Sequence, residues 1–297
     1  MPINHPGPGP RNTLQQRLRH RYYVRRTDRQ DRKCRSWIGL DTFVDDWQHA
    51  MGLPRPRSVA ASNRTLWLLW SQGEKQAPPL VRYCIESWRR MNPGWTVRVL
   101  DGDALATWTN LPRLPSHVAT RHIANIGRLA LLRRYGGVWA DATSLALKPL
   151  DLWLGAVKPT GFFAFRWPQP LRELANWFIA ADAGHPLVEA WLRWSVIYLR
   201  SRWRPASYFW SHFTFNWLVR HSTRLRLAWD NVPAVSARGP HVMQRILDGH
   251  VSGPDLPSAE ALATLPLFKM NWKKGYAVDQ IRDQLARFGL PDPAPTL

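Results

Sequence analysis

One carboxylate with hydroxyl groups beside it is the most chemically suggestive feature of the sequence. Asp141 is followed by Ala142, Thr143 and Ser144. Hard divalent cations bind oxygen ligands of this kind, and a metal held there could bridge a phosphate. The alternative is structural, because a short acid can also cap the turn that follows it. We interpret Asp141 as the main candidate for binding a metal or a diphosphate.

The residues before Asp141 predict a helix, a glycine break and a strand. A helix is expected over residues 117–134, and Gly136 and Gly137 follow it as glycines do at helix ends. Residues 138–141 then form a short apolar strand that ends in the carboxylate of Asp141. Ligands in open α/β sheets bind beyond the carboxyl ends of the strands, where the strand order reverses. Asp141 is therefore expected at a binding edge, with the glycine pair allowing a ligand to approach closely.

Four more residues are candidates for ligand contacts. Asn125 and Arg128 are three residues apart in the predicted helix, so they share one face. Arg128 could pair with a phosphate through its guanidinium, or form an ordinary ion pair on the helix surface. Gln72 and Gly73 follow a predicted strand over residues 65–70, where loops contact ligands in such sheets, although a simple turn is the alternative.

Two histidines are candidates from the second half of the chain. His212 lies in a predicted helix that is apolar on almost every side, where a lone histidine is more often a core residue than a ligand. His241 follows Gly239 and Pro240 and is expected on a loop, where functional histidines are commoner. Either could contact a diphosphate or a metal, and no residue is identified as a general base.

The order of the predicted elements indicates an α/β fold with a mixed sheet flanked by helices. Residues 65–70 and 95–100 are apolar strands, and a helix between them begins near Pro79. The absence of a GxGxxG or Walker loop argues against dinucleotide-binding and P-loop proteins. Further strands are predicted at 138–141, 144–147, 162–165 and 266–270. The chain beyond residue 170 is predicted to be helical, with segments at 176–181, 187–200, 208–219 and 242–247.

The composition predicts a polyanionic partner. Lys and Arg number 41 against 21 Asp and Glu, a net charge of +20, which suits nucleic acid, an anionic membrane or a phosphorylated substrate. Cys34 and Cys84 match neither a disulfide framework nor a metal site. The 18 tryptophans mostly stand among apolar residues, which predicts core packing, while a minority could line a cleft.

The chain is predicted to have three parts. Residues 1–60 form a basic, partly disordered arm that includes an amphipathic helix at 37–51, residues 61–280 form the globular domain, and residues 281–297 form a tail. No apolar run approaches the ~20 residues of a membrane span, and no secretory segment is recognised. A cytoplasmic protein is expected, and its arm could bind the anionic inner face of a membrane at about 1 kcal/mol per basic residue.

The segment from Arg128 to Thr143 resembles a known signature. Its pattern, Arg-Leu-Ala-Leu-Leu-x-x-Tyr-Gly-Gly-Val-Trp-x-Asp-Ala-Thr, is similar to that of the capsular polysaccharide synthesis proteins. These proteins are relatives of the glycosyltransferases whose sugar-binding region carries a DXD motif. The similarity covers roughly residues 64–275. It includes Leu66-Trp-x-x-Trp-x-Gln-Gly73, Cys84-Ile-Glu-Ser-Trp88, Asn92-Pro93, Asn176-Trp-Phe-Ile-Ala180 and Tyr208-Phe-x-x-His212.

The resemblance implies a GT-A-like fold. It implies an enzyme that transfers a sugar from a nucleotide-sugar donor to a glycan or lipid-linked acceptor in surface or capsular polysaccharide synthesis. It also implies Mn²⁺ or Mg²⁺, with Asp141 as the catalytic and metal-binding residue. Two positions depart from the pattern. Thr143 stands where DXD enzymes have a second carboxylate, and Asn125 stands where an aspartate usually precedes Arg128. A lone carboxylate holds Mg²⁺ mainly through water and phosphates, so donor and ion would bind together.

Two other functions stay open. The departures at Asn125 and Thr143 would suit a sugar-binding relative without catalytic activity. The charge and the aromatic residues would suit a nucleic-acid-binding protein. Nucleic acid is the less favoured partner, because the densest run of arginines is in the arm and no known nucleic-acid module is present.

Overall fold

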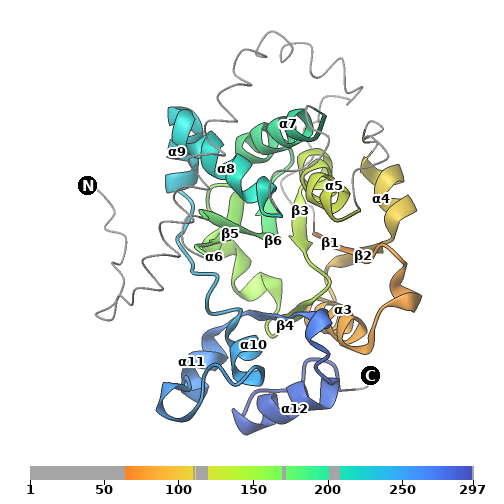
Figure 1. Cartoon of the computed structure of the whole chain (residues 1–297), viewed down its shortest axis with the longest axis vertical. Helices are drawn as coiled ribbons and strands as arrows, with labels where there is room; N and C mark the ends of the chain where they lie inside the picture. The colour runs from red at the N-terminus through yellow and green to blue at the C-terminus, as the bar shows by residue number, and fades with distance from the viewer. Residues whose placement is uncertain (1–63, 110, 112–119, 169–171, 201–207, 296–297) are drawn as a thin grey trace.

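The structure is a computed structural model that describes residues 64–109, 111, 120–168, 172–200 and 208–295. The predicted basic arm and the predicted helix at 37–51 lie outside these residues. The described chain forms a central sheet with helices on both faces (Figure 1). No helix in this part of the chain is both long enough and apolar enough to cross a membrane.

The central sheet has five strands in the order β2-β1-β3-β6-β5. They are β1 (Thr65–Leu69), β2 (Thr96–Leu100), β3 (Gly137–Ala140), β5 (Phe162–Arg166) and β6 (Leu174–Ala181). β1 pairs in parallel with both β2 and β3, whereas β6 is antiparallel to β3 and β5. The predicted mixed sheet is thus confirmed. Because β2 and β3 lie on opposite sides of β1, a crevice is expected beyond the carboxyl ends of β1 and β3.

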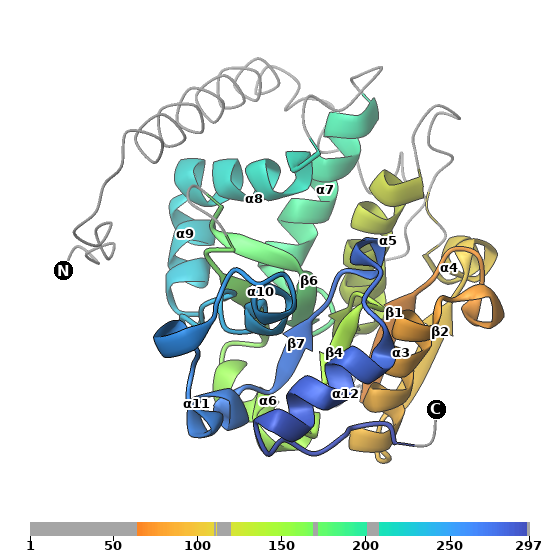
Figure 2. The same cartoon turned by 60° about the horizontal axis from the view of Figure 1, so that its bottom comes forward.

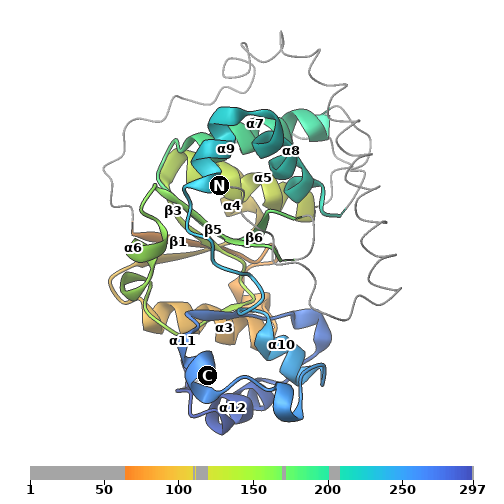
Figure 3. The same cartoon turned by 90° about the vertical axis from the view of Figure 1, so that its left-hand side faces the viewer.

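Two layers of helices enclose the sheet (Figure 3). One layer contains α4 (Gly102–Thr109), α5 (Thr120–Tyr135), α7 (Pro186–Arg200), α8 (Trp210–His221) and α9 (Thr223–Asp230). The other layer contains α3 (Pro79–Met91), and beyond it lie α10 (Val242–Leu247), α11 (Ala259–Thr264) and α12 (Val278–Arg287). The short α6 (Leu154–Val157) precedes β5. Helices dominate after β6, which confirms the predicted helical C-terminal half.

Local sequence explains the first crossover. β1 is a continuous apolar run, and its Leu66 and Leu68 are fully buried, as expected for a strand covered on both faces. Pro79 begins α3, a position where the missing N–H costs no hydrogen bond. Asn92 follows the helix, and its side-chain amide donates to the carbonyl oxygen of Trp88 at 2.9 Å, which satisfies one of the last helical carbonyls.

A second, two-stranded sheet brings the C-terminal residues to the centre of the protein. β4 (Ser144–Ala146) pairs antiparallel with β7 (Leu267–Lys269), and the register places Lys269 opposite Ser144. Figure 2 shows these two strands beside each other, with α10 and α12 nearby. A separate hydrophobic cluster supports this region, and it includes Cys84, Leu145, Phe268, Met270, Ile281 and Leu285.

Two predicted features differ from the structure. Residues 176–181 belong to strand β6 and not to a helix, because a short run that is buried on every side carries no period that separates the two. The tail predicted to start at residue 281 begins inside α12. Ile281 and Leu285 of that helix are buried, since they are the apolar face of an amphipathic segment.

Candidate functional site

A cleft of about 1060 Å³ opens beyond the carboxyl ends of β1 and β3. Residues 70–72 line it after β1, and residues 141–143 line it after β3, because these parallel neighbours end at the same edge of the sheet. α5 and α8 also contribute lining residues. Residues 269–273, from β7 and the turn that follows it, complete the cleft. This is the sheet edge at which the sequence predicted a ligand site.

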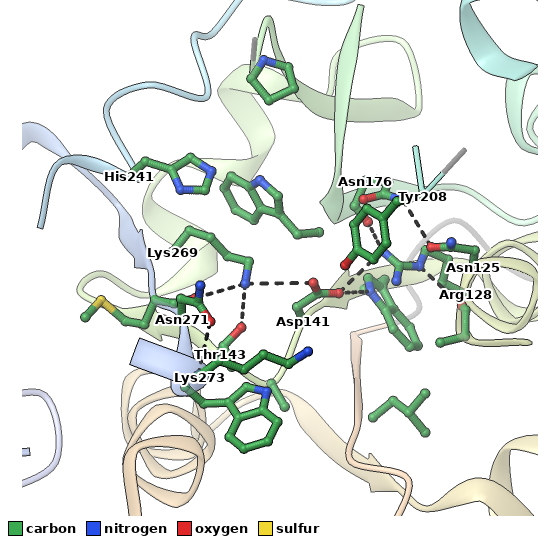
Figure 4. Close-up of a pocket in the computed structure, with 18 of the residues that line it drawn as sticks. Asn125, Arg128, Asp141, Thr143, Asn176, Tyr208, His241, Lys269, Asn271 and Lys273 are labelled. Carbon is green, nitrogen blue, oxygen red and sulfur yellow. Dashed lines mark hydrogen bonds and ion pairs between the residues drawn. The ribbon is translucent and has the colours of Figure 1, made fainter. Parts of the chain in front are cut away.

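Asp141 is the one carboxylate among the described residues that line the cleft. Its backbone N–H donates to the carbonyl oxygen of Trp177 on β6 at 2.7 Å, which fixes its position at the end of β3. The indole N–H of Trp139 donates to Oδ1 at 3.1 Å. The side chain is 32% exposed, so the carboxylate is open to a ligand in the cleft (Figure 4).

Arg128 reaches this carboxylate from α5. Its Nη1 lies 3.4 Å from Oδ1 of Asp141 and also donates to the carbonyl oxygen of Asn176. The guanidinium lies over the ring of Trp139, with 4.9 Å between them. Burial lowers the pKa of Arg128 and Asp141 opposes this shift, but an arginine keeps its charge in a protein. Arg128 therefore forms an ion pair with Asp141, but the pair lies in the lining of the cleft and not on the exposed helix surface, where the structural alternative placed it.

Asn125 is connected to the same group of residues. The side-chain amide of Asn176 donates to Oδ1 of Asn125 at 3.1 Å, and the backbone of Asn176 accepts from Arg128. Asn125 and Arg128 both line the cleft, which agrees with the prediction from their three-residue spacing that they share one face of the helix. The face of α5 is thereby fixed against β6.

Lys269 approaches Asp141 from the opposite side. Its Nζ donates to the hydroxyl of Thr143 and to the carbonyl oxygen of Met270, the latter at 3.1 Å, and lies 3.9 Å from Oδ2 of Asp141. Burial lowers the pKa of Lys269, whereas the charge of Asp141 raises it. Asp141 thus lies between two cations that come from different layers of the fold (Figure 4).

The cleft is strongly positive. Six basic side chains face the single acid among its described lining residues, and they are Arg128, Arg172, Arg238, Arg245, Lys269 and Lys273. Such an excess of fixed charge concentrates anions. The ligand to which this cleft is complementary is therefore an anion with several negative charges.

Both candidate histidines line the cleft, and both are neutral at neutral pH. Burial, with Arg172 and Arg128 nearby, places the pKa of His212 well below its usual value, and its Nδ1 has no hydrogen-bond partner in the described structure. Burial, reinforced by Lys269 and Arg172, lowers the pKa of His241 to about 4. Neutral imidazoles can exchange hydrogen bonds with a ligand without adding charge.

Three predicted ligand contacts lie elsewhere. Gln72 lines the cleft but Gly73 does not. Gly136 precedes β3 and Gly137 begins it, at the end opposite to Asp141, and both have positive φ angles, +66° and +94°. A Cβ at Gly137 would stand 2.4 Å from the carbonyl oxygen of Thr65 on β1. Gly137 therefore permits close packing of β1 on β3, and neither glycine lines the cleft in which a ligand contact was predicted.

Several lining residues were missed by sequence reasoning. Lys269 is the most informative, because the predicted strand at 266–270 is otherwise apolar and a charged residue within it was a usable signal. Arg172 and Lys273 do not lie in a predicted apolar strand, so their charge did not mark them as lining residues. Among the tryptophans, most of the described ones are core residues, as predicted, and those that line the cleft are Trp70, Trp139, Trp177 and Trp272.

The cleft fits the implied Mn²⁺ or Mg²⁺ poorly. Such an ion favours several oxygen ligands, usually with a carboxylate among them. In the described residues, no group of three His, Cys, Asp or Glu could hold a metal. The hydroxyl of Thr143 already accepts from Lys269, and Asp141 already faces two cations. A metal at Asp141 remains an untested prediction.

The fold and the cleft define a class: an α/β protein with a strongly basic cleft at the carboxyl ends of its sheet strands. Comparison with known sequences specifies it further. Residues 52–285 match the family described as capsular polysaccharide synthesis protein, so the chain belongs to that family. The resemblance seen in the segment from Arg128 to Thr143 is thereby confirmed.

Individual relatives are glycosyltransferases by name. The O-glycosyltransferase braB of Annulohypoxylon truncatum is 28% identical over 188 residues, 56% of this chain and 42% of that protein. The glycosyltransferase afumC of Aspergillus fumigatus is 31% identical over 154 residues, 44% of this chain and 39% of that protein. The chain thus matches about two fifths of the length of each. Among solved structures, PaToxG Glycosyltransferase has a TM-score of 0.37 and 13% identity, covering 68% of this chain and 83% of that one.

Proposed function

We propose that the protein is a glycosyltransferase whose donor is a sugar linked to a nucleoside diphosphate. The observation that carries this proposal is the cleft at the strand ends, whose described lining holds six basic side chains and one carboxylate. Its family and the names of its relatives support the same activity. A nucleoside diphosphate is an anion with several negative charges, which is the ligand that such a cleft attracts.

The cleft has groups that could bind the diphosphate and the sugar of the donor. Arg128 and Lys269 are held in place by hydrogen bonds to oxygen atoms of the protein, so they can stabilise charge on a diphosphate without moving. Asp141 lies between them with a partly exposed carboxylate, which can accept hydrogen bonds from sugar hydroxyls.

In the proposed reaction, the bond between the anomeric carbon and the diphosphate oxygen breaks, and its electron pair leaves with the diphosphate. An oxygen atom of the acceptor forms the new bond to the anomeric carbon. The acceptor proton passes to the released diphosphate or to water. Because negative charge grows on the diphosphate as it leaves, fixed cations stabilise the transition state more than the bound donor.

The acceptor is proposed to be a glycan or a lipid-linked glycan, consistent with the family's description, and the name O-glycosyltransferase of one relative supports transfer to an oxygen. Trp272 is a candidate contact. It is 41% exposed, and it lines both the cleft and a second cavity of about 580 Å³. An exposed indole can pack against a sugar ring next to the reaction site.

Two measurements test the proposal. The first is a thermal-shift panel of nucleoside diphosphates, in which a true ligand at about 100 times its Kd stabilises the protein by about 2.7 kcal/mol. The second is release of UDP or GDP from the corresponding sugar donors. Binding without release from any donor would favour the inactive relative, and the absence of any binding would refute the proposal.

A further inference from the structure

The ammonium group of Lys269 lies among oxygen atoms that could otherwise hold a metal ion beside Asp141. The Nζ of Lys269 donates to the Thr143 hydroxyl and to the Met270 carbonyl, and it lies 3.9 Å from Oδ2 of Asp141 (Figure 4). Thr143 stands at the position where a second metal-binding carboxylate was expected. The positive charge beside Asp141 is therefore that of the Lys269 side chain, at the place where a metal ion was expected.

We propose that Lys269 replaces a divalent cation in this protein, so that the diphosphate of the donor binds to the Lys269 ammonium directly and binding requires no metal. This inference rests on the proposed function and specifies how the same cleft binds its donor. Lys269 is thereby a donor-binding residue, and Asp141 contacts the donor without an intervening ion.

The hydrogen bonds of Lys269 leave room for a phosphate. An ammonium group has three N–H donors, and two are used by Thr143 and Met270. The separation of 3.9 Å from Asp141 is longer than a hydrogen bond. One N–H is therefore available to an oxygen atom of a ligand in the cleft, which Lys269 lines.

The ammonium is also held rigidly. The backbone N–H of Lys269 donates to the carbonyl oxygen of Pro240 at 2.7 Å, and its carbonyl oxygen accepts from the side chain of Gln244. Its side chain is only 13% exposed. Because the group is fixed before a ligand arrives, little conformational entropy is lost when a phosphate binds.

The same surroundings oppose a metal. A divalent cation on Asp141 would meet the positive charges of Arg128, 3.4 Å from the carboxylate, and of Lys269, 3.9 Å from it. Thr143 would offer a neutral oxygen in place of a carboxylate, and a hydroxyl that already accepts a hydrogen bond from Lys269. Like charges at such short range repel each other even when water screens them.

The test uses the full chain and two probes, UDP and GDP, with Kd measured by isothermal titration calorimetry in EDTA and again in MnCl₂. The inference predicts that the wild type binds at least one probe with the same Kd under both conditions. Lys269→Met should weaken that binding by about tenfold to a hundredfold, since one hydrogen bond from a charged group is lost. Lys269→Arg, which keeps the charge, should retain more of the affinity than Lys269→Met.

Lys274→Met is the matched control. It removes the same charge five residues away, from a side chain that pairs with Asp248 and does not line the cleft. Its Kd should stay within about twofold of the wild type, because screening weakens charges that are not in contact. Equal losses in Lys269→Met and Lys274→Met would show that only the total charge matters and would overturn the inference.

The wild-type measurements decide the question even if a variant does not fold. Binding that disappears in EDTA and returns with MnCl₂ would overturn the inference and leave the proposed function intact. No binding of either probe in any condition would count against the proposed function, and the inference would fail with it. Unchanged affinity in a folded Lys269→Met variant would also overturn the inference.

Discussion

Replacing Gly137 by alanine should destabilise the protein without touching its cleft. Gly137 has a φ angle of +94° and begins β3 beside β1. A Cβ there would stand 2.4 Å from the carbonyl oxygen of Thr65 and 3.4 Å from the indole nitrogen of Trp67. Backbone atoms of a paired strand cannot move aside as a flexible side chain can, so the two strands would have to separate.

Two costs add in this variant. A non-glycine residue in the left-handed region costs about 1–2 kcal/mol, and overpacking in a tightly packed region costs about 1–3 kcal/mol. Gly137→Ala should therefore lower the free energy of unfolding by about 2–5 kcal/mol. This is a large part of the ~5–15 kcal/mol that is typical of a folded domain.

Gly73→Ala separates the two costs. Gly73 has a similar φ angle, +88°, with ψ 148°, but nothing lies within 4 Å of the Cβ it would gain, so only the backbone cost of about 1–3 kcal/mol applies. Urea unfolding of both variants gives the comparison. If Gly137→Ala costs no more than Gly73→Ala, the packing argument is wrong. If it weakens binding of UDP or GDP at unchanged stability, the original interpretation of Gly137 as a ligand contact is restored.

Three further predictions concern the cleft and the arm. Asp141→Asn should reduce nucleotide release by about 10²- to 10³-fold, because a contact to the donor at the reaction site is lost. Its melting temperature should fall as well, since the largely buried Arg128 and Lys269 lose the negative charge between them, so release is measured at a temperature at which the variant is folded; retained activity would remove Asp141 from the reaction. The pKa of His241 is lowered to about 4 in the folded protein, whereas a histidine in the unfolded chain has a pKa of about 6.5. The unfolded chain therefore binds more protons below pH ~6.5, and the free energy of unfolding decreases as the pH is lowered from about 6.5 to about 4. His241→Gln should recover about 2–3 kcal/mol of this loss near pH 4.5, and a parallel pH profile for both proteins would contradict it. Deletion of residues 1–60 should abolish co-sedimentation with anionic vesicles, and equal binding by both forms would exclude the arm as the membrane contact.

The features that could be predicted from sequence are those with local causes. The apolar run of β1, the proline at the start of α3 and the glycines after α5 each act on their immediate neighbours. Asp141 could be placed at a binding edge for the same reason, since it directly follows a short apolar strand. Asn125 and Arg128 share a face of α5 because helical geometry fixes that relation.

The features that could not be predicted depend on pairing between distant segments. Lys269 and Thr143 are 126 residues apart, and only the β4–β7 register brings them together. The role of Gly137 depends on the neighbouring strand, β1, because its close contact is with Thr65. Leu174–Ala181 is a strand because it lies between β3 and β5, and the segment itself does not specify this.

Because Lys269 lies on β7, near the end of the chain, the cleft is completed only after the central sheet. During synthesis the central sheet can be completed while β7 is still untranslated, and such a chain already carries Arg128 and Asp141. It lacks the ammonium group, which arrives only when β7 docks on β4. A product shortened by proteolysis before residue 267 would also lack Lys269, so on the inferred role of Lys269 an intact central sheet would not by itself show that the cleft can bind the donor.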